Sequence, residues 1–277
     1  HEDHPDYTSF YTFNDEVISK NIYLLLAAYE TLGNEAYRKA AYRGMDFYLL
    51  SQLPSPQSGW AHQYDMNLKP AQARSYEPAA VCSSQTVTNI EDLQNFYSIT
   101  GDRRFLHPIP HAIRWLEDSA INRGLPKDFT HAIYYELVSN KPLYIHHSHR
   151  EGTSKEILRF WVGPEPIVDL TYGKLPNINT QVIHREYEHL KSSSPQEARA
   201  QYQKRKQMAA RPSAVDLEKI RKLISSMDSR GAWLTDIKFL DTLDYVHNPP
   251  TAFRGIDTAT YVNNMYEFID FLNGAKR

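Results

Sequence analysis

A helix-length pattern occurs twice in this chain at a fixed distance, and it limits the fold more than any other feature. The segment NIYLLLAAYETLGNEAY starts at Asn21 and aligns with NIEDLQNFYSITGDRRF, which starts at Asn89, so the offset is 89 − 21 = 68 residues. Both copies carry apolar side chains at the three-and-four spacing of one helix face, and both reach a glycine. The matched pairs are Asn21 and Asn89, Ile22 and Ile90, Leu25 and Leu93, Tyr29 and Tyr97, Gly33 and Gly101, and Tyr37 and Phe105.

The first copy belongs to a predicted helical hairpin. Apolar spacing predicts helices over residues 17–31 and 36–50, with Gly33 as the stop of the first and Asn34 as the start of the second. A partial third copy is expected in residues 260–274, with Gly274 as its stop. Repeated hairpins joined by long loops predict a mainly α fold, an (α/α) toroid whose inner helices present loop ends to a central cleft. The alternative is chance similarity between two amphipathic helices.

The rest of the chain has a different character. Residues 132–145 are aromatic and β-branched around a turn-like segment at 139–142, which predicts a few short strands or a hairpin. Residues 180–212 are polar and charged with few apolar anchors, so we expect an exposed helix or a mobile insertion there. Residues 215–227 predict another amphipathic helix. A chain of 277 residues with 41% hydrophobic residues can bury one large core, and we expect a single domain over 1–277.

Composition restricts the partners. The formal net charge of −2 and the pI near 6.7 give no global basic field, so neither nucleic acid nor an anionic membrane is an expected partner. Cys82 is the only cysteine, which excludes an intramolecular disulfide and a CxxC redox motif. The sequence has no apolar run of about 18 residues, and its first residues do not form a secretion signal. We expect a soluble monomer.

A proline-punctuated loop at residues 58–78, between two helix-like segments, concentrates side chains that bind sugars. Aromatic rings suit sugar faces, amides and arginine suit hydroxyls and carboxylates, and acidic groups suit a hard cation such as calcium. Loops held by rigid helices often carry chemistry. The loop therefore predicts a binding surface for an acidic carbohydrate, and its members of interest are Trp60, Gln63, Tyr64, Asp65, Arg74, Tyr76 and Glu77.

Three motifs in a fixed order resemble those of family-ten pectate lyases. They are TFNDEVISKNIYLLL, then GWAHQYD followed by ARSYEP, then YYELVSNKPLYIHHSHREG, and they cover roughly residues 10–155. The resemblance implies an incomplete (α/α) toroid, calcium (Ca2+) dependence and β-elimination of polygalacturonate. It also implies further helices before TFND, whereas this sequence begins only a few residues upstream, so we expect either that the N-terminal part has been removed or that the cleft is open on one side. Around Arg150 the chain departs from the family pattern, because it has three histidines and Glu151 in place of aspartate.

The resemblance also implies roles for individual residues. Asp15 and Glu77 match the acidic positions that would hold calcium, with Asp15 taking part in catalysis, and Arg150 matches the arginine base. Calcium would neutralise the substrate carboxylate, which must be stabilised when the adjacent proton is removed. From the residues themselves, a bidentate guanidinium suits a carboxylate clamp, and we expect substrate contacts from Arg74, Arg254, Trp60, Gln63, Tyr64 and His149.

Several of these residues also have a purely structural explanation. Asp15 lies near a helix start, where a carboxylate commonly caps the helix, and Glu77 has the alternative of being an ordinary loop carboxylate. The cluster of His146, His147 and His149 is more typical of an exposed polar turn than of a zinc site. It nevertheless allows a histidine to act as the general base near neutral pH.

The sequence therefore predicts a secreted or periplasmic pectate lyase that cleaves de-esterified polygalacturonate with calcium and an arginine base. One alternative is a lyase for another uronate polymer with a histidine base. A second is a non-catalytic pectin-binding toroid, and a remoter one is an intracellular helical-repeat interaction module.

Overall fold

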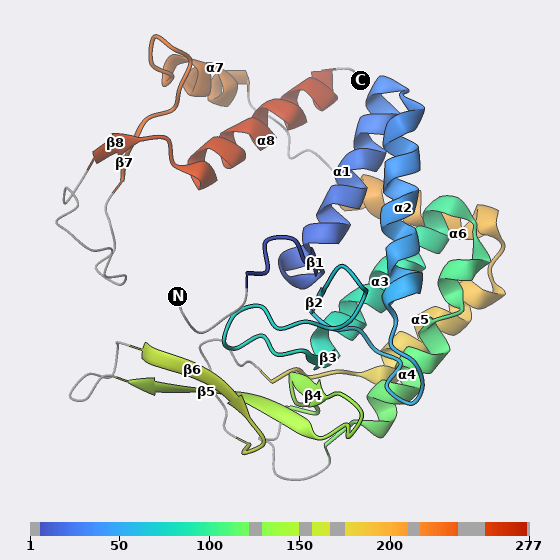
Figure 1. Ribbon diagram of the computed structural model, residues 1–277. Coiled ribbons are helices and arrows are strands. Elements are labelled where there is room, and N and C mark those ends of the chain that lie inside the picture. Colours follow the sequence, from blue (N-terminus) through green and yellow to red (C-terminus); the bar gives the residue numbers. More distant parts are fainter. Residues whose placement is uncertain are drawn as a thin grey trace. The chain divides into compact units, whose positions relative to one another are not determined.

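The computed structural model describes residues 6–121, 129–149, 157–166, 175–209, 217–237 and 253–275. Contacts within the chain form two compact units, unit 1 (His1–Gln203) and unit 2 (Lys204–Arg277), where the sequence predicted one domain. Each unit is described by itself (Figure 1). The described residues are mainly helical with a few short antiparallel strands, which confirms the predicted class. None of the described helices is both long enough and apolar enough to span a membrane.

Unit 1 contains most of the secondary structure. Its helices are α1 (Val17–Leu32), α2 (Glu35–Ser51), α3 (Ser83–Thr100), α4 (Ile109–Asp118) and α5 (Thr180–Ser192), with 3-10 turns η1 (Asn14–Glu16) and η2 (Arg103–Leu106). Helix α6 (Pro195–Ala209) begins in unit 1 and crosses its boundary after Gln203. Its strands are β1 (Tyr11–Thr12), β2 (Gln63–Tyr64), β3 (Ala80–Cys82), β4 (Tyr134–Glu136), β5 (Pro142–His149) and β6 (Ile157–Gly163).

The two copies of the sequence repeat end in the same way. Gly33 follows α1 with φ 69° and Gly101 follows α3 with φ 76°, both in the left-handed region that glycine enters without steric cost. The amide of Gly33 donates to the carbonyl of Tyr29 at 2.9 Å, and that of Gly101 donates to Tyr97 at 2.7 Å. The matched glycine and tyrosine positions therefore form one cap geometry twice.

Helix α3 is buried along much of its length and organises the core of unit 1. Edge-to-face rings connect it to its neighbours, since the ring of Phe13 lies 4.8 Å from that of Tyr48, which lies 5.0 Å from Phe96. The hydroxyls of Tyr23 and Tyr48 donate to the two oxygens of Asp92 at 2.9 and 2.8 Å, so this buried carboxylate is paired. The core thus combines aromatic packing with one closed polar network.

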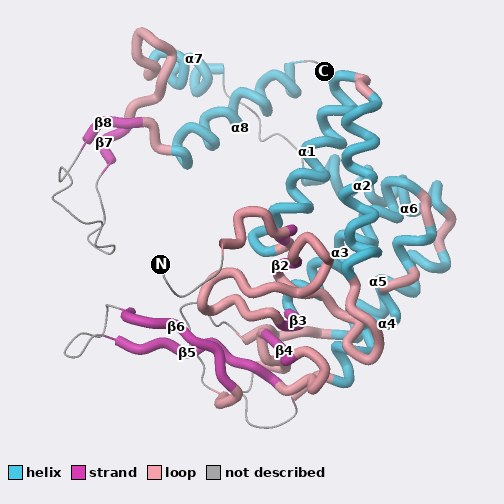
Figure 2. The backbone as a smooth tube through the Cα atoms, viewed as in Figure 1, coloured by secondary structure: helices cyan, strands magenta, loops and turns pink. Residues whose placement is uncertain are grey.

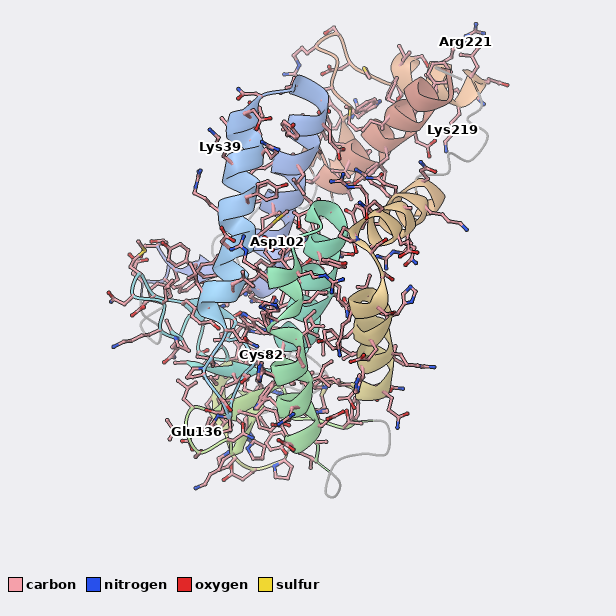
Figure 3. The ribbon with its side chains drawn as sticks, turned by 90° about the vertical axis from the view of Figure 1, so that its right-hand side faces the viewer. Lys39, Cys82, Asp102, Glu136, Lys219 and Arg221 are labelled. Carbon is pink, nitrogen blue, oxygen red and sulfur yellow. The ribbon has the colours of Figure 1, made fainter. Side chains whose placement is uncertain are left out.

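Four strands form an antiparallel sheet in the order β3-β4-β5-β6 (Figure 2). The predicted hairpin around residues 139–142 is confirmed, because β4 and β5 pair on either side of that turn. Side chains alternate between the two faces. Tyr135 and Tyr144 join the main helical core, whereas Cys82, Tyr134 and Ile145 form a second buried cluster on the opposite face. Figure 3 labels Cys82 inside unit 1, next to the start of α3.

The exposed helix that was one alternative for the polar run at residues 180–212 is confirmed for the described part up to residue 209, whose residues are mostly exposed. This part contains α5 and α6, and α5 packs along α4. Tyr187, Leu190 and Ala198 are buried in the main core, and the hydroxyl of Tyr97 donates to the carbonyl of Ser193 at 2.9 Å. Three anchors among many charged residues suffice for docking.

Unit 2 contains α7 (Leu217–Ser225), β7 (Thr235–Ile237), β8 (Phe253–Gly255) and α8 (Thr258–Ala275). Helix α7 confirms the helix predicted around residues 215–227. The ring of Trp233 lies 5.9 Å from Tyr261 and 5.8 Å from Phe268, and this aromatic group packs against α8. The expected helix stop at Gly274 is wrong, because α8 continues through Ala275.

Candidate functional site

The loop at residues 58–78 lies between α2 and β3, and backbone hydrogen bonds connect it to β1 and to β3. Strand β2 within the loop pairs with β1, and the amide of Cys82 donates to the carbonyl of Trp60 at 2.8 Å. Trp60 and Tyr64 are completely buried, and the indole of Trp60 donates to the carbonyl of Tyr48 at 2.9 Å. The substrate contacts predicted for these two aromatics are corrected accordingly, because both rings are core packing that fixes the loop.

A tight turn places Arg74 and Glu77 at the end of this loop. The amide of Glu77 donates to the carbonyl of Arg74 at 2.9 Å, and the amide of Arg74 donates to Oε2 of Glu77 at 3.2 Å. The Arg74 guanidinium also donates from Nη1 to Oε1 of Glu77 at 3.2 Å. Backbone and side chain therefore close the same four-residue turn, and the guanidinium is held in place at one end.

The turn before α1 carries the acidic residue that the sequence analysis singled out. Asp15 and Glu16 have φ values of 56° and 59°, a left-handed conformation that non-glycine residues adopt at a cost. Neither η1 nor α1 has a side-chain cap, so the capping explanation for Asp15 is not supported. Two consecutive residues in this conformation turn the Asp15 side chain outward, where it is 71% exposed.

Two distant motifs meet at this place. Nη1 of Arg74 lies 4.0 Å from Oδ2 of Asp15, and the side-chain Nδ2 of Asn14 donates to Oε1 of Glu77 at 2.7 Å. Gln63 is buried and donates to Oε2 of Glu77 at 3.3 Å. The Arg74 side chain remains 43% exposed, whereas that of Glu77 is only 4% exposed. We name this group the Arg74 cluster, and its members are Asn14, Asp15, Gln63, Arg74 and Glu77.

The surroundings of Arg74 favour its charged form. Burial of the Arg74 guanidinium is the largest single effect and opposes its charge, but the Glu77 carboxylate together with Tyr7 and Tyr76 outweighs it, so the pKa of Arg74 is raised. Arg74 is thus a permanent cation with an exposed side between two carboxylates. Such a group is suited to pair with the carboxylate of an acidic ligand.

The donor set can be tested against the calcium ion that the resemblance implies. A carboxylate has about four lone-pair positions. Glu77 uses its positions on four protein donors, namely the side chains of Asn14 and Gln63 and both the amide and the guanidinium of Arg74. Glu77 in this arrangement does not fit a calcium ligand, whereas the exposed carboxylate of Asp15 does. Across the part of the chain that the structure describes, no three His, Cys, Asp or Glu side chains gather as metal ligands.

The remaining predicted residues do not join the cluster in the described structure. Arg150 lies outside the described residues, as does the side chain of His149, although His149 itself ends β5. Arg254 belongs to unit 2, on β8, where its Nε lies 3.7 Å from Oδ1 of Asp236. Of the predicted site residues, the structure therefore brings Asp15, Arg74 and Glu77 close together, and Gln63 contacts Glu77.

The histidine cluster is part of a strand and not an exposed turn, so that prediction is wrong. Residues alternate in β5, and the buried ring of His146 stacks on Trp161 at 5.3 Å while His147 faces Phe160 at 6.0 Å. The paired residues of β5 and β6 place these two histidines on opposite faces. His146 and His147 consequently cannot share one metal ion in this strand.

Sequence reasoning missed His62 and its partners. His62 is buried, and its ring lies between Cys82 and Tyr134. Burial lowers the pKa of His62 to about 4 and raises the pKa of Cys82 to about 11. Both groups are therefore neutral near pH 7. The only signal in the sequence was a histidine inside the tryptophan loop, which by itself indicates no partner.

Comparison with known proteins adds no assignment: no model of a known protein family matches this chain, and no curated protein sequence matches it.

Proposed function

We propose that unit 1 binds polygalacturonate and cleaves it by β-elimination at the Arg74 cluster. The observation that carries this proposal is the approach of Arg74 Nη1 to Asp15 Oδ2 at 4.0 Å and to Glu77 Oε1 at 3.2 Å. These residues come from two of the three motifs that resemble pectate lyases, and they are far apart in the sequence. Their convergence supports a shared role that neither motif alone would imply.

The chemistry of elimination requires positive charge beside the substrate carboxylate. Removal of the proton next to a uronate carboxylate builds negative charge on that group, and an oriented cation stabilises it in the transition state. Arg74 supplies such a cation, because Glu77 binds one side of the guanidinium and leaves the side chain 43% exposed. Calcium, held through Asp15, would add positive charge at the same carboxylate.

The base belongs to the third motif. Arg150 directly follows His149, the last residue of β5, and the resemblance assigns it the proton transfer. A free guanidinium has a pKa above about 12, so Arg150 would need a strongly cationic or buried environment to accept a proton. His149 is the alternative base, and it would go with a different uronate polymer.

The proposed fold is consistent with the position of the Arg74 cluster. Two helical hairpins, α1 with α2 and α3 with α4, whose first helices end in the same glycine cap, would be the repeating units of the proposed (α/α) toroid. The Arg74 cluster lies where the loop between the hairpins meets the start of α1. Loop ends at the inner helices are where such a toroid would present its cleft.

Polygalacturonate digestion tests the function directly. The full chain is incubated with polygalacturonate and calcium, and the ultraviolet absorbance of the unsaturated product is followed. We expect product from the wild type, loss of product in Arg74→Ala and Arg150→Ala, and no change in Arg38→Ala, an exposed arginine on α2 paired with Glu35. An active Arg150→Ala together with an inactive His149→Ala would move the base to the histidine.

Two further arms separate the alternatives. Activity that survives a chelator would show that Arg74 suffices without calcium, and activity that is lost would assign the metal a role. Measured binding of oligogalacturonate without product under any divalent metal would identify a non-catalytic binding protein. A wild type that neither binds nor cleaves polygalacturonate would overturn the proposed function.

A further inference from the structure

We propose that His62 is a positioning residue for the Arg74 cluster, because its side chain is fixed in the core while its carbonyl sets the turn that carries Asn14 and Asp15. The expected effect of His62 on substrate binding and turnover rests on the proposed function. Its effect on the turn before α1 does not depend on any substrate. His62 does not touch the members of the cluster with its ring; it acts through the backbone.

The backbone of His62 replaces the missing helix cap. Its carbonyl accepts from the amide of Phe13 at 2.8 Å and from the amide of Asn14 at 3.3 Å. These amides begin η1, and neither η1 nor α1 has a side-chain cap. Unpaired amides at a helix start need an acceptor, and a carbonyl from a separate loop provides it. The position of His62 therefore decides where the turn before α1 lies.

The ring of His62 is fixed on both nitrogens. Nδ1 lies 3.0 Å from the hydroxyl of Tyr134, and Nε2 lies 3.1 Å from Sγ of Cys82. The ring also meets that of Tyr134 edge-to-face, with centroids 5.3 Å apart. Cys82 and Tyr134 are themselves buried and paired across β3 and β4. A rotation of the imidazole would break two hydrogen bonds inside a packed cluster, so the residue has one orientation.

Hydrogen-bond satisfaction assigns the tautomer. The Tyr134 hydroxyl is buried, and among the described residues Nδ1 of His62 lies within hydrogen-bond distance of it. If that hydroxyl donates to Nδ1, then Nε2 carries the hydrogen and donates to Sγ of Cys82, whose thiol can donate to Oγ of Ser84 at 3.3 Å. The opposite tautomer would leave the buried hydroxyl without an acceptor, which is costly. The Nε2–H form satisfies every donor in the chain of contacts.

The turn set by His62 determines the geometry of the cluster. Asn14 donates to Glu77 at 2.7 Å, and Asp15 follows it in the left-handed conformation that brings its carboxylate within 4.0 Å of Arg74. A shift of about 1 Å in such a turn is enough to disturb a site that depends on orientation. His62 itself is not suited to proton transfer, because burial lowers its pKa to about 4.

The structural part is tested by amide hydrogen exchange and by the ring nitrogen shifts of His62 in the full chain. We expect the shifts of an Nε2–H tautomer in the wild type. In His62→Ala the exchange at Phe13 and Asn14 should accelerate by about tenfold or more, since their shared acceptor becomes mobile. His62→Gln, whose amide can still donate to Sγ of Cys82, should restore most of the protection.

Leu116→Ala is the control for loss of core packing, because Leu116 is also a buried residue, on α4, and its side chain lies outside this network. It should leave exchange at Asn14 unchanged. Unchanged exchange in His62→Ala, or an equal acceleration in Leu116→Ala, would overturn the positioning role.

The functional part is tested by oligogalacturonate affinity and turnover. We expect weaker binding and slower turnover in His62→Ala, with recovery in His62→Gln, at a temperature where all variants are folded. Affinity and turnover equal to those of the wild type in His62→Ala would overturn the positioning role. If the wild type itself neither binds nor cleaves the oligomer, the proposed function fails, while the exchange measurements still decide the role of His62.

Discussion

Asn14 donates a hydrogen bond of 2.7 Å from its side chain to Oε1 of Glu77, and this bond helps to connect the start of α1 to the loop that leads into β3. The two residues are 63 positions apart in the sequence. Glu77 receives three more donors from Gln63 and Arg74 while it is only 3% exposed. A buried charge with this many partners anchors the loop, and the cluster depends on it.

The first prediction concerns the charge of Glu77. Glu77→Gln replaces one of two carboxylate oxygens with an amide group that faces protein donors, so buried donors lose their acceptor. We expect the free energy of unfolding to fall by about 2 to 3 kcal/mol in urea denaturation. The control is Glu16→Gln, because that side chain is 59% exposed and its change should stay within about 0.5 kcal/mol. Equal stabilities of the two variants would contradict the anchoring role.

The second prediction concerns the close packing before Trp60. A Cβ on Gly59 would lie 2.7 Å from Oγ1 of Thr86, 2.7 Å from Cγ1 of Val81 and 2.8 Å from Cζ3 of Trp115. Three different elements crowd this position, so Gly59→Ala must displace the loop and should lower the free energy of unfolding by about 1 to 3 kcal/mol.

Gly44→Ala is the comparison for the Gly59 variant. Its new methyl group would meet atoms of one side chain only, with Cγ1 of Ile22 at 2.7 Å, and alanine favours the helix in which it lies. Thermal unfolding should therefore show a smaller loss for Gly44→Ala. A Gly59→Ala protein as stable as the wild type would show that the loop relaxes without cost.

The third prediction uses the repeated cap. Gly33→Ala and Gly101→Ala both place a Cβ on a left-handed residue, which costs about 1 to 2 kcal/mol. A Cβ at Gly33 meets nothing within 4 Å, whereas at Gly101 it lies 3.0 Å from Cβ of Pro195. Denaturant unfolding should show a loss in both variants and a larger one at Gly101. A larger loss at Gly33 would contradict the packing of Pro195 on the second cap.

The repeat was readable from the sequence because its signals are local. A glycine four residues after a tyrosine, at the end of an amphipathic stripe, determines the cap wherever it occurs, and Gly33 and Gly101 obey it. The strands around residues 139–142 were predictable for the same reason. The anchors of α5 and α6 were not, since Leu190 and Ala198 are isolated apolar residues in a polar run.

The candidate site was readable only in part. Arg74 and Glu77 lie three residues apart, so their turn is local, whereas the sequence does not show that Trp60 points inward. His62 lies 72 residues from its partner Tyr134, and one histidine in a loop carries no periodic signal. Contacts across such separations depend on the packing of the sheet against the loop, which residue pattern alone does not determine.

The fourth prediction follows from the lowered pKa of His62, which burial brings from 6.5 to about 4. Between these pH values the unfolded chain binds a proton at His62 and the folded chain does not. Linkage then requires that stability rises with pH across this window and is lost as the pH falls through it. The contribution of the histidine should therefore be complete above about pH 6.5 and should decrease by about 3 kcal/mol on the way to pH 4.

Comparison with His62→Gln isolates this contribution, because glutamine does not titrate and all other groups are shared. The free energies of unfolding of the two proteins, measured in urea at a series of pH values, should differ by a constant amount above pH 6.5. As the pH falls, the wild type should lose stability relative to the variant. If the difference in free energy of unfolding between wild type and His62→Gln stays constant down to pH 4, the folded protein accepts the proton at His62 as readily as the unfolded chain. That result would contradict the assignment of a neutral His62 ring in the folded protein.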